Sequence, residues 1–111
     1  MAAGTPLVDI RSSDQRRADG VIEGAIWYPR NVLEWRFDLT SGNADPALID
    51  PARRAILLCA EGYQTSPAAA TLHDLGFERA TDVEDGFVGW QAAGLPVRPF
   101  DDAIDLRQGS G

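Results

Sequence analysis

The sequence contains no lysine, one cysteine and one histidine among its 111 residues. A single cysteine excludes an internal disulfide framework and any zinc or iron–sulfur site that needs several cysteines. All ten cationic side chains are arginine, and seventeen acidic ones outnumber them, so the net charge is −7. Such a chain lacks the clustered cations that bind a phosphate backbone, and no nucleic-acid partner is expected.

Long apolar runs are also missing. No stretch approaches the ~20 apolar residues of a membrane helix, so no membrane partner is expected. The first residues lack the basic and long apolar segments of a secretory signal, which together with the lone cysteine predicts a cytoplasmic protein. The length predicts one domain over residues 1–111, with a core at about 6–97 and a polar tail at 98–111. We expect this tail to fray from about Asp101 onward.

Short apolar runs alternate with segments of helical spacing. Strands are expected at 7–10, 25–28, 55–59 and 80–83, and helices at 13–19, 31–37, 66–75 and 86–93. The run from Ala55 to Cys59 is continuously apolar, which is typical of a central parallel strand covered on both faces. The alternation predicts an α/β fold with a small, mostly parallel central sheet flanked by helices.

Cys59 ends the strongest predicted strand and stands just before the strongest predicted helix. Ligands of open α/β sheets bind at this crevice. The segment from Ala60 to Gln64 is too short for secondary structure, and its N–H groups can surround the sulfur while Gly62 supplies a positive φ. Such amides and the positive end of the helix dipole stabilise a thiolate. The pattern also fits an inert buried thiol, and the residues alone leave both interpretations open.

Three motifs occur in order over residues 6–97. They are Leu7-Val8-Asp9-Ile10-Arg11 with Gly20–Ala25, then Cys59–Thr65 with Ala68-Ala69, Leu72 and Gly76, and finally Asp85–Val97 with Trp90 and Pro96. Together they resemble the rhodanese-like sulfurtransferases, whose loop runs Cys-x-x-Gly-x-Arg-Ser. Val21, Glu23, Gln64 and Asp85 depart from the family pattern, which has His, Pro, Arg and Gly at these places. The loop therefore has no cation and one anion, Glu61, and we expect weak binding of thiosulfate.

The resemblance implies a three-layer fold and transfer of sulfane sulfur through a Cys59 persulfide. It implies a substrate-binding loop made of Ala60, Glu61, Gly62, Tyr63, Gln64 and Thr65, with Tyr63 on its rim. A small molecule such as thiosulfate would donate the sulfur, and an external small-molecule or protein thiol, or cyanide, would accept it. No metal or organic cofactor is implied.

Supporting residues are expected on either side of this loop. The family often supplies an arginine after its second strand, and Arg30 and Arg36 stand there. Each could instead pair with Glu34 or Asp38 on the surface. Arg36 is preferred because Trp35 should be buried and hold the segment in place. Asp9 and Arg11 are expected to form a structural pair beside the loop. The alternative is that Asp9 supports the loop from behind, because it ends the first strand at the same edge as Cys59.

Other residues are expected to be structural. Trp27, Phe87 and Trp90 are interpreted as core anchors, and His73 as an exposed helix position. Two other functions remain open. One is a non-catalytic interaction or regulatory module of the same fold. The other is a Cdc25-type phosphatase or arsenate reductase, although such enzymes have a longer loop with an arginine near its end.

Overall fold

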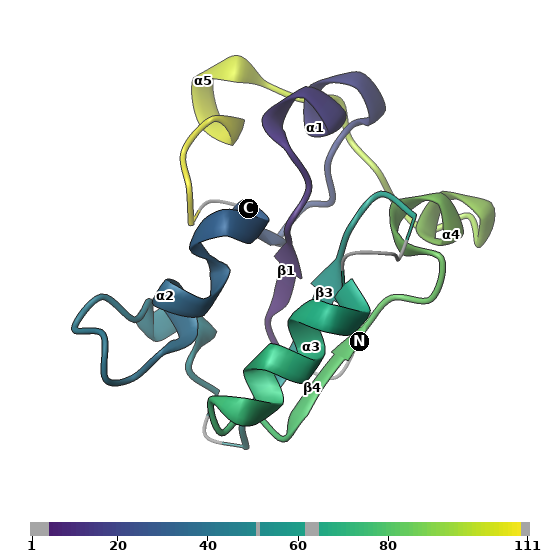
Figure 1. The fold of residues 1–111 in the computed structure, drawn as a ribbon. Helices are drawn as coiled ribbons and strands as arrows, with labels where there is room; N and C mark the ends of the chain where they lie inside the picture. Colours follow the sequence, from purple (N-terminus) through teal and green to yellow (C-terminus); the bar gives the residue numbers. More distant parts are fainter. Residues whose placement is uncertain (1–4, 51, 62–64, 110–111) are drawn as a thin grey trace.

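The computed structural model describes residues 5–50, 52–61 and 65–109, which contain one parallel four-stranded sheet (Figure 1). Its strands are β1 (Leu7–Asp9), β2 (Ile26–Trp27), β3 (Arg54–Leu58) and β4 (Arg79–Asp82), in the order β2-β1-β3-β4. Because all neighbouring pairs are parallel, the four strands end at one edge of the sheet, here called the carboxyl edge.

β3 lies inside the sheet, as its continuous apolar run predicts. Leu57 pairs with Val8 of β1 on one side and with Asp82 of β4 on the other. Ala55, Leu57 and Leu58 are fully buried. A strand whose two faces are both covered carries apolar side chains on both faces. This explains why polar and apolar residues do not alternate in its sequence.

Helices cover both faces of the sheet and complete the predicted three-layer α/β fold. They are α1 (Ser13–Asp19), α2 (Leu33–Phe37), α3 (Thr65–Asp74), α4 (Gly86–Ala92) and α5 (Asp102–Asp105), with 3-10 turns at Arg30–Val32 and Pro46–Leu48. In Figure 1, α3 lies in front of β3 and β4, while α1 and α5 lie side by side. A Ser12–Gln15 capping box starts α1, and Gly20 ends it with φ +90°, as the sequence predicts.

The face under α2 and α3 is held by apolar packing. Leu33, Phe37, Leu72 and Phe77 are fully buried, and the Phe37 and Phe77 rings meet edge to face at 5.0 Å. The expectation that Trp35 is buried is wrong, since its exposed fraction is 49%. Leu33 and Phe37 are four residues apart and occupy the inward side of α2, which turns Trp35 outward.

The opposite face combines a smaller apolar cluster with buried charge. Leu7, Ile22, Leu58 and Phe87 form the cluster, with Trp90 packed against it. Trp27 is buried, and its indole N–H donates to the Arg11 carbonyl at 2.8 Å. The three aromatic residues expected to anchor the core therefore pack as predicted, although Trp90 is only partly buried.

The expectation that the chain frays from Asp101 is wrong. Residues 102–105 form α5, and the Asp105 carboxylate is fully buried. Arg98 donates two hydrogen bonds to this carboxylate at 2.6 and 2.7 Å, and the Gly109 N–H donates to the Trp27 carbonyl at 2.7 Å. The partners of Asp105 are thus Arg98, seven residues away, and Arg16, 89 residues away, and neither of them was identified from the sequence.

Two departures from the family pattern meet at the start of this segment. Val21 and Arg98 form an antiparallel bridge, with backbone hydrogen bonds of 2.8 Å in both directions. Glu23 forms an ion pair with the Arg98 side chain. Val21 and Glu23 therefore help to hold the segment that leads to α5.

Within residues 5–50, 52–61 and 65–109, no helix has the length and apolar character needed to cross a bilayer.

Candidate active site

Cys59 follows β3 directly at the carboxyl edge, where the sequence predicts a nucleophile. Its exposed fraction is 3%, and it belongs to the apolar cluster that also contains Ile10 of the β1–α1 connection and Ala68 of α3. Helix α3 begins at Thr65, so its N-terminal, electropositive end lies on the same side of the sheet as the sulfur. The position combines a thiol, a helix N-terminus and a short connection.

Part of the predicted loop lies outside the described residues. Gly62, Tyr63 and Gln64 belong to that part, as does the side chain of Thr65. The ring of amides around the sulfur and the rim contact of Tyr63 stay predictions. Ala60 and Glu61 are described, with Ala60 partly buried and Glu61 exposed.

The first turn of α4 fixes the backbone after the nucleophile. The Phe87 N–H donates to the Cys59 carbonyl at 2.7 Å, and the Val88 N–H donates to the Ala60 carbonyl at 3.1 Å. Two successive amides of one helix thereby hold two successive carbonyls of the loop. Phe87 was assigned to the core from the sequence, and this role was missed. The hydrogen bond is made by the backbone amide, which does not depend on which side chain the residue carries.

A tight turn places α4 close enough to make these bonds. Asp85 and Gly86 have φ values of +59° and +58°, in the left-handed region. Asp85 replaces a family glycine, and aspartate is among the few other residues that tolerate this conformation. A Cβ on Gly89 would lie 2.4 Å from the Glu84 carbonyl oxygen, so glycine is required there for the helix to pass the turn.

Asp9 and Arg11 form the predicted pair. The Arg11 Nε donates to Asp9 Oδ1 at 3.0 Å and its Nη2 to Asp9 Oδ2 at 2.8 Å, with both side chains buried. The Arg11 guanidinium also lies 3.9 Å from the centre of the Phe87 ring. The pair therefore supports the residue whose amide holds the Cys59 carbonyl.

A second buried arginine shares the Asp9 carboxylate. The Arg16 Nε lies 3.4 Å from Asp9 Oδ2, and its guanidinium lies 4.5 Å from the centre of the Trp27 ring. Burial lowers the pKa of Arg16, while the Asp9 and Asp105 carboxylates oppose that shift. Asp9 thus balances two cations behind the site.

Arg30 and Arg36 both have partners close to them in the chain. Arg30 forms an ion pair with Glu34, one of the two surface partners expected for it. The Arg36 guanidinium donates to the Asn43 carbonyl at 3.1 Å and lies 5.2 Å from the centre of the Tyr28 ring. Because Trp35 is exposed, the reason for preferring Arg36 no longer holds.

Arg30 also lines a hollow at the carboxyl edge. The hollow has a volume of about 310 Å³ and is lined by Ile10, Ser12, Gln15, Pro29 and Arg30. The Ile10 N–H donates to the Leu58 carbonyl at 2.8 Å, so the hollow begins one strand away from Cys59. Arg30 therefore lies at the carboxyl edge, but its charge is already paired with Glu34.

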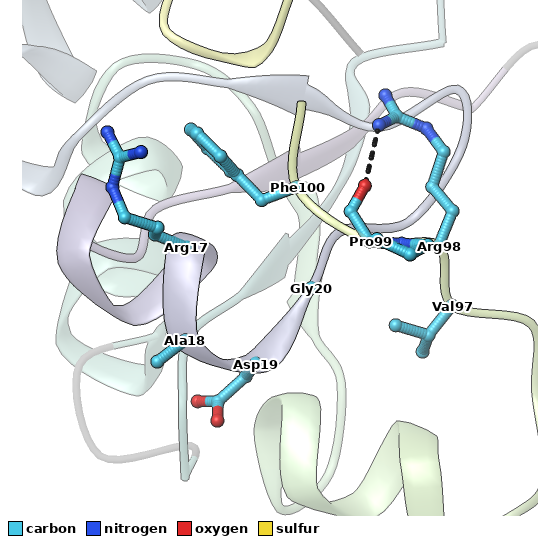
Figure 2. Close-up of a pocket in the computed structure, with 8 residues that line it drawn as sticks. All are labelled: Arg17, Ala18, Asp19, Gly20, Val97, Arg98, Pro99 and Phe100. Carbon is cyan, nitrogen blue, oxygen red and sulfur yellow. Dashed lines mark hydrogen bonds between the residues drawn. The ribbon is translucent and has the colours of Figure 1, made fainter. Parts of the chain in front are cut away.

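A larger hollow lies between the end of α1 and residues 97–100 (Figure 2). Its volume is about 420 Å³, and Phe100 stands between Arg17 and Arg98 in this view. Arg17 is paired with Asp102, and Arg98 with Glu23 and Asp105. Their charges are already balanced, so this hollow is a poor anion site.

His73 is exposed on α3, as predicted, and its Nε2 lies 2.8 Å from the Ala80 carbonyl oxygen. Across the three described ranges, no group of three or more His, Cys, Asp or Glu side chains could hold a metal ion.

Comparisons with known proteins agree with this architecture. The family profile described as "Rhodanese-like domain" matches residues 1–93. The thiosulfate sulfurtransferase GlpE of Actinobacillus pleuropneumoniae is 35% identical over 96 residues, which cover 85% of this chain and 78% of the relative.

Solved structures show the same fold. A Rhodopseudomonas palustris protein of unknown function, described as a possible tyrosine phosphatase, superposes with a TM-score of 0.79 at 32% identity, covering 86% of this chain and 72% of that one. A rhodanese-like domain from Anabaena superposes with a TM-score of 0.65 at 26% identity, covering 85% and 80%.

Proposed function

The chain belongs to the rhodanese-like family, and from that premise we propose that it is a sulfurtransferase that carries sulfane sulfur on Cys59. The observation that carries this proposal is the position of the thiol. Cys59 lies between the end of β3 and the N-terminus of α3, and two α4 amides hold the backbone that follows it.

The reaction has two steps. The Cys59 thiolate attacks the outer sulfur of a donor such as thiosulfate, a new S–S bond forms, and sulfite leaves with the electron pair of the broken bond. An acceptor thiolate then attacks the outer sulfur of the Cys59 persulfide, and the Cys59 thiolate leaves. A covalent intermediate divides one transfer into two, and the predicted loop amides would stabilise negative charge on sulfur in both steps.

The acceptor comes from outside the chain. Cys59 is the only cysteine of the sequence, so no second thiol of the same chain can take the sulfur. We therefore propose a small-molecule donor and an external acceptor. The cytoplasmic location expected from the sequence stays a prediction.

Intact mass spectrometry after incubation with thiosulfate tests the proposal. We expect a mass gain of one sulfur atom that disappears on adding cyanide or dithiothreitol. Cys59→Ser, which keeps the size of the side chain, is expected to show no gain. If no adduct forms with thiosulfate, mercaptopyruvate or glutathione persulfide, the proposal is wrong and a non-catalytic interaction module is favoured.

Glu61 gives a kinetic test of the same site. Its carboxylate is exposed beside the nucleophile and would repel a dianion. We expect Glu61→Arg to react faster with thiosulfate, and Glu61→Gln to fall between this variant and the wild type. Equal rates for all three would show that the carboxylate does not face the path of the donor.

A phosphatase is the second candidate because of the Rhodopseudomonas palustris structure described as a possible tyrosine phosphatase. The segment from Cys59 to Thr65 has no arginine, and an oxyanion of that kind is usually held by a bidentate guanidinium. We expect no Cys59-dependent hydrolysis of p-nitrophenyl phosphate. Turnover that Cys59→Ser abolishes would favour the phosphatase instead.

A further inference from the structure

We infer that the sulfur acceptor is a protein whose thiol lies among basic residues, and that it docks on a hollow beside the Cys59 loop. This inference rests on the proposed function and names the partner of its second step. The docking surface consists of Glu61, Glu84, Asp85, Val88 and Ala92, and is called here the acceptor surface.

The acceptor surface contains a hollow on α4, next to the loop that follows Cys59. Its volume is about 310 Å³, and it is lined by Glu61, Asp85, Val88, Gly89 and Ala92. Gly89 has no side chain and Ala92 has only a methyl group, so space stays open between the other three residues. The hollow is joined to the loop because the Val88 N–H donates to the carbonyl of Ala60, the residue next to Cys59. A group seated here contacts α4 next to the backbone of the loop.

An apolar side chain is exposed at the centre of this surface. Val88 lies in the first turn of α4 with an exposed fraction of 55%, whereas the preceding Phe87 is buried. A small molecule such as thiosulfate offers nothing apolar to cover it. A protein partner offers apolar surface, and its burial against Val88 is favourable.

The charge of the surface identifies the kind of partner. Glu61, Glu84 and Asp85 are exposed, and none forms an ion pair with any residue in the described part of the chain. Exposed acidic residues elsewhere are of both kinds, since Glu23 and Asp102 pair with arginine whereas Asp74 and Glu78 form no ion pair with a described residue. The acceptor surface differs in holding three such carboxylates beside the Cys59 loop. Three unpaired carboxylates beside a nucleophile attract a cationic partner and repel an anionic one.

Two arginines stand at the start of β3 and β4, at the other end of these strands. Arg54 begins β3 and Arg79 begins β4, so both stand at the amino edge, and Arg53 precedes them in the chain. The carboxyl ends of the same two strands lead to Glu61 and to Glu84. The exposed charge that directly follows β3 and β4 is therefore acidic, and it favours a basic partner at this place.

The chemistry of the second step favours the same partner. The attacking acceptor must be a thiolate, and neighbouring lysine or arginine residues increase the thiolate fraction of a cysteine. Those residues would also meet the carboxylates of the acceptor surface. One arrangement of charge therefore both activates the acceptor thiol and brings it to the persulfide.

Discharge of the persulfide to charged peptides tests the inference. The protein is loaded with thiosulfate, freed of excess donor, and mixed with short peptides of equal length in which one cysteine is flanked by arginines or by glutamates. Mass spectrometry follows the loss of the added sulfur. Each rate is divided by the rate of that peptide with neutral 4,4′-dithiodipyridine, which removes differences in intrinsic thiol reactivity.

Two matched variants locate the effect. Glu84→Gln/Asp85→Asn removes two charges from the acceptor surface, and asparagine tolerates the positive φ of position 85. Asp74→Asn/Glu78→Gln removes two exposed charges at the end of α3 and before β4, at the amino edge. Both variants change the net charge equally.

We expect the wild type to prefer the basic peptide by about tenfold at low salt. The preference should fall to about threefold in Glu84→Gln/Asp85→Asn, stay near tenfold in Asp74→Asn/Glu78→Gln, and disappear near 1 M salt. Equal rates for both peptides, or equal losses in both variants, would overturn the inference while sulfur transfer stands. Failure of Cys59 to take up sulfur would overturn the proposed function and this inference with it.

Discussion

Around β1 the charged side chains are buried and paired, whereas beside Cys59 they are exposed and form no ion pair with a described residue. Asp9, Arg11 and Arg16 meet within one cluster, and Arg98 with Asp105 forms another. Glu61, Glu84 and Asp85 have no comparable partner in the described ranges. The buried, paired charges stabilise the fold, and the exposed charges beside Cys59 are available to another molecule. Substitutions in both regions should therefore separate stability from reaction rate.

The largest effect is expected for Asp9→Asn, which leaves two buried guanidinium groups without their shared anion. Loss of one member of a buried ion pair costs about 3–5 kcal/mol. Urea unfolding measures the loss, and Asp74→Asn is the exposed control. A cost below about 1 kcal/mol, small on the scale of such pairs, would show that the cluster is not what holds β1 to α1.

A smaller effect is expected for Asp105→Asn, because Arg98 keeps Glu23 and is partly exposed. Loss of charge-assisted hydrogen bonds costs about 1.5–3 kcal/mol. The hydrogen bonds from Arg98 hold the pKa of Asp105 below its ordinary value. The unfolded chain therefore takes up a proton first as the pH falls below about 4, and stability is lost there. Acid titration of unfolding should show a shallower loss for Asp105→Asn than for the wild type.

Tyr28 extends the paired region to the end of β2, where its hydroxyl donates to Asp45. Burial, together with this hydrogen bond, raises the pKa of Tyr28 from 10.0 to about 12. The raised pKa means that stability present below pH 10.0 is lost as the pH rises toward about 12. We expect Tyr28→Phe to cost about 1 kcal/mol at neutral pH and to remove that alkaline loss. Tyrosinate absorbance and alkaline unfolding test both parts, and a Tyr28 that titrates at its ordinary pKa would contradict them.

The smallest effect on stability is expected for Glu84→Gln/Asp85→Asn. Exposed side chains without partners change the free energy of unfolding by less than about 0.5 kcal/mol when replaced. Thermal and urea unfolding measure this, in the same protein used for the peptide experiment. A large loss would show that these carboxylates support the turn before α4, and the contrast between the two regions would then disappear.

Local pattern predicted the parts of this protein that depend on local causes. The run from Ala55 to Leu58 was predicted as a covered strand from its continuous apolar character, and Gly20 ends α1 through its own backbone freedom. Asp9 and Arg11 are two residues apart, so their pairing was accessible to sequence reasoning. The position of Cys59 relative to β3 and α3 followed from the same local signals.

The failures have long-range causes. The Asp105 carboxylate is held by Arg98, seven residues earlier, and its carbonyl by Arg16, 89 residues earlier. The second contact could not be predicted from a local pattern. Trp35 was expected inside because it is large and apolar, but the four-residue spacing of its neighbours Leu33 and Phe37 decides which side of α2 faces inward. The amides of Phe87 and Val88 hold the loop through the backbone, which any residue other than proline could do.

β2 is an outer strand, and its last residues show how the chain protects it. The Tyr28 N–H donates toward β1, to the Asp9 carbonyl, while the Trp27 carbonyl accepts the Gly109 N–H on the opposite side. Outer strands with open backbone groups invite pairing with another molecule. A protein shortened after Leu106 would keep Cys59 and the Asp105 carboxylate, yet uncover that carbonyl, and should aggregate on storage while its freshly prepared monomer still carries sulfur.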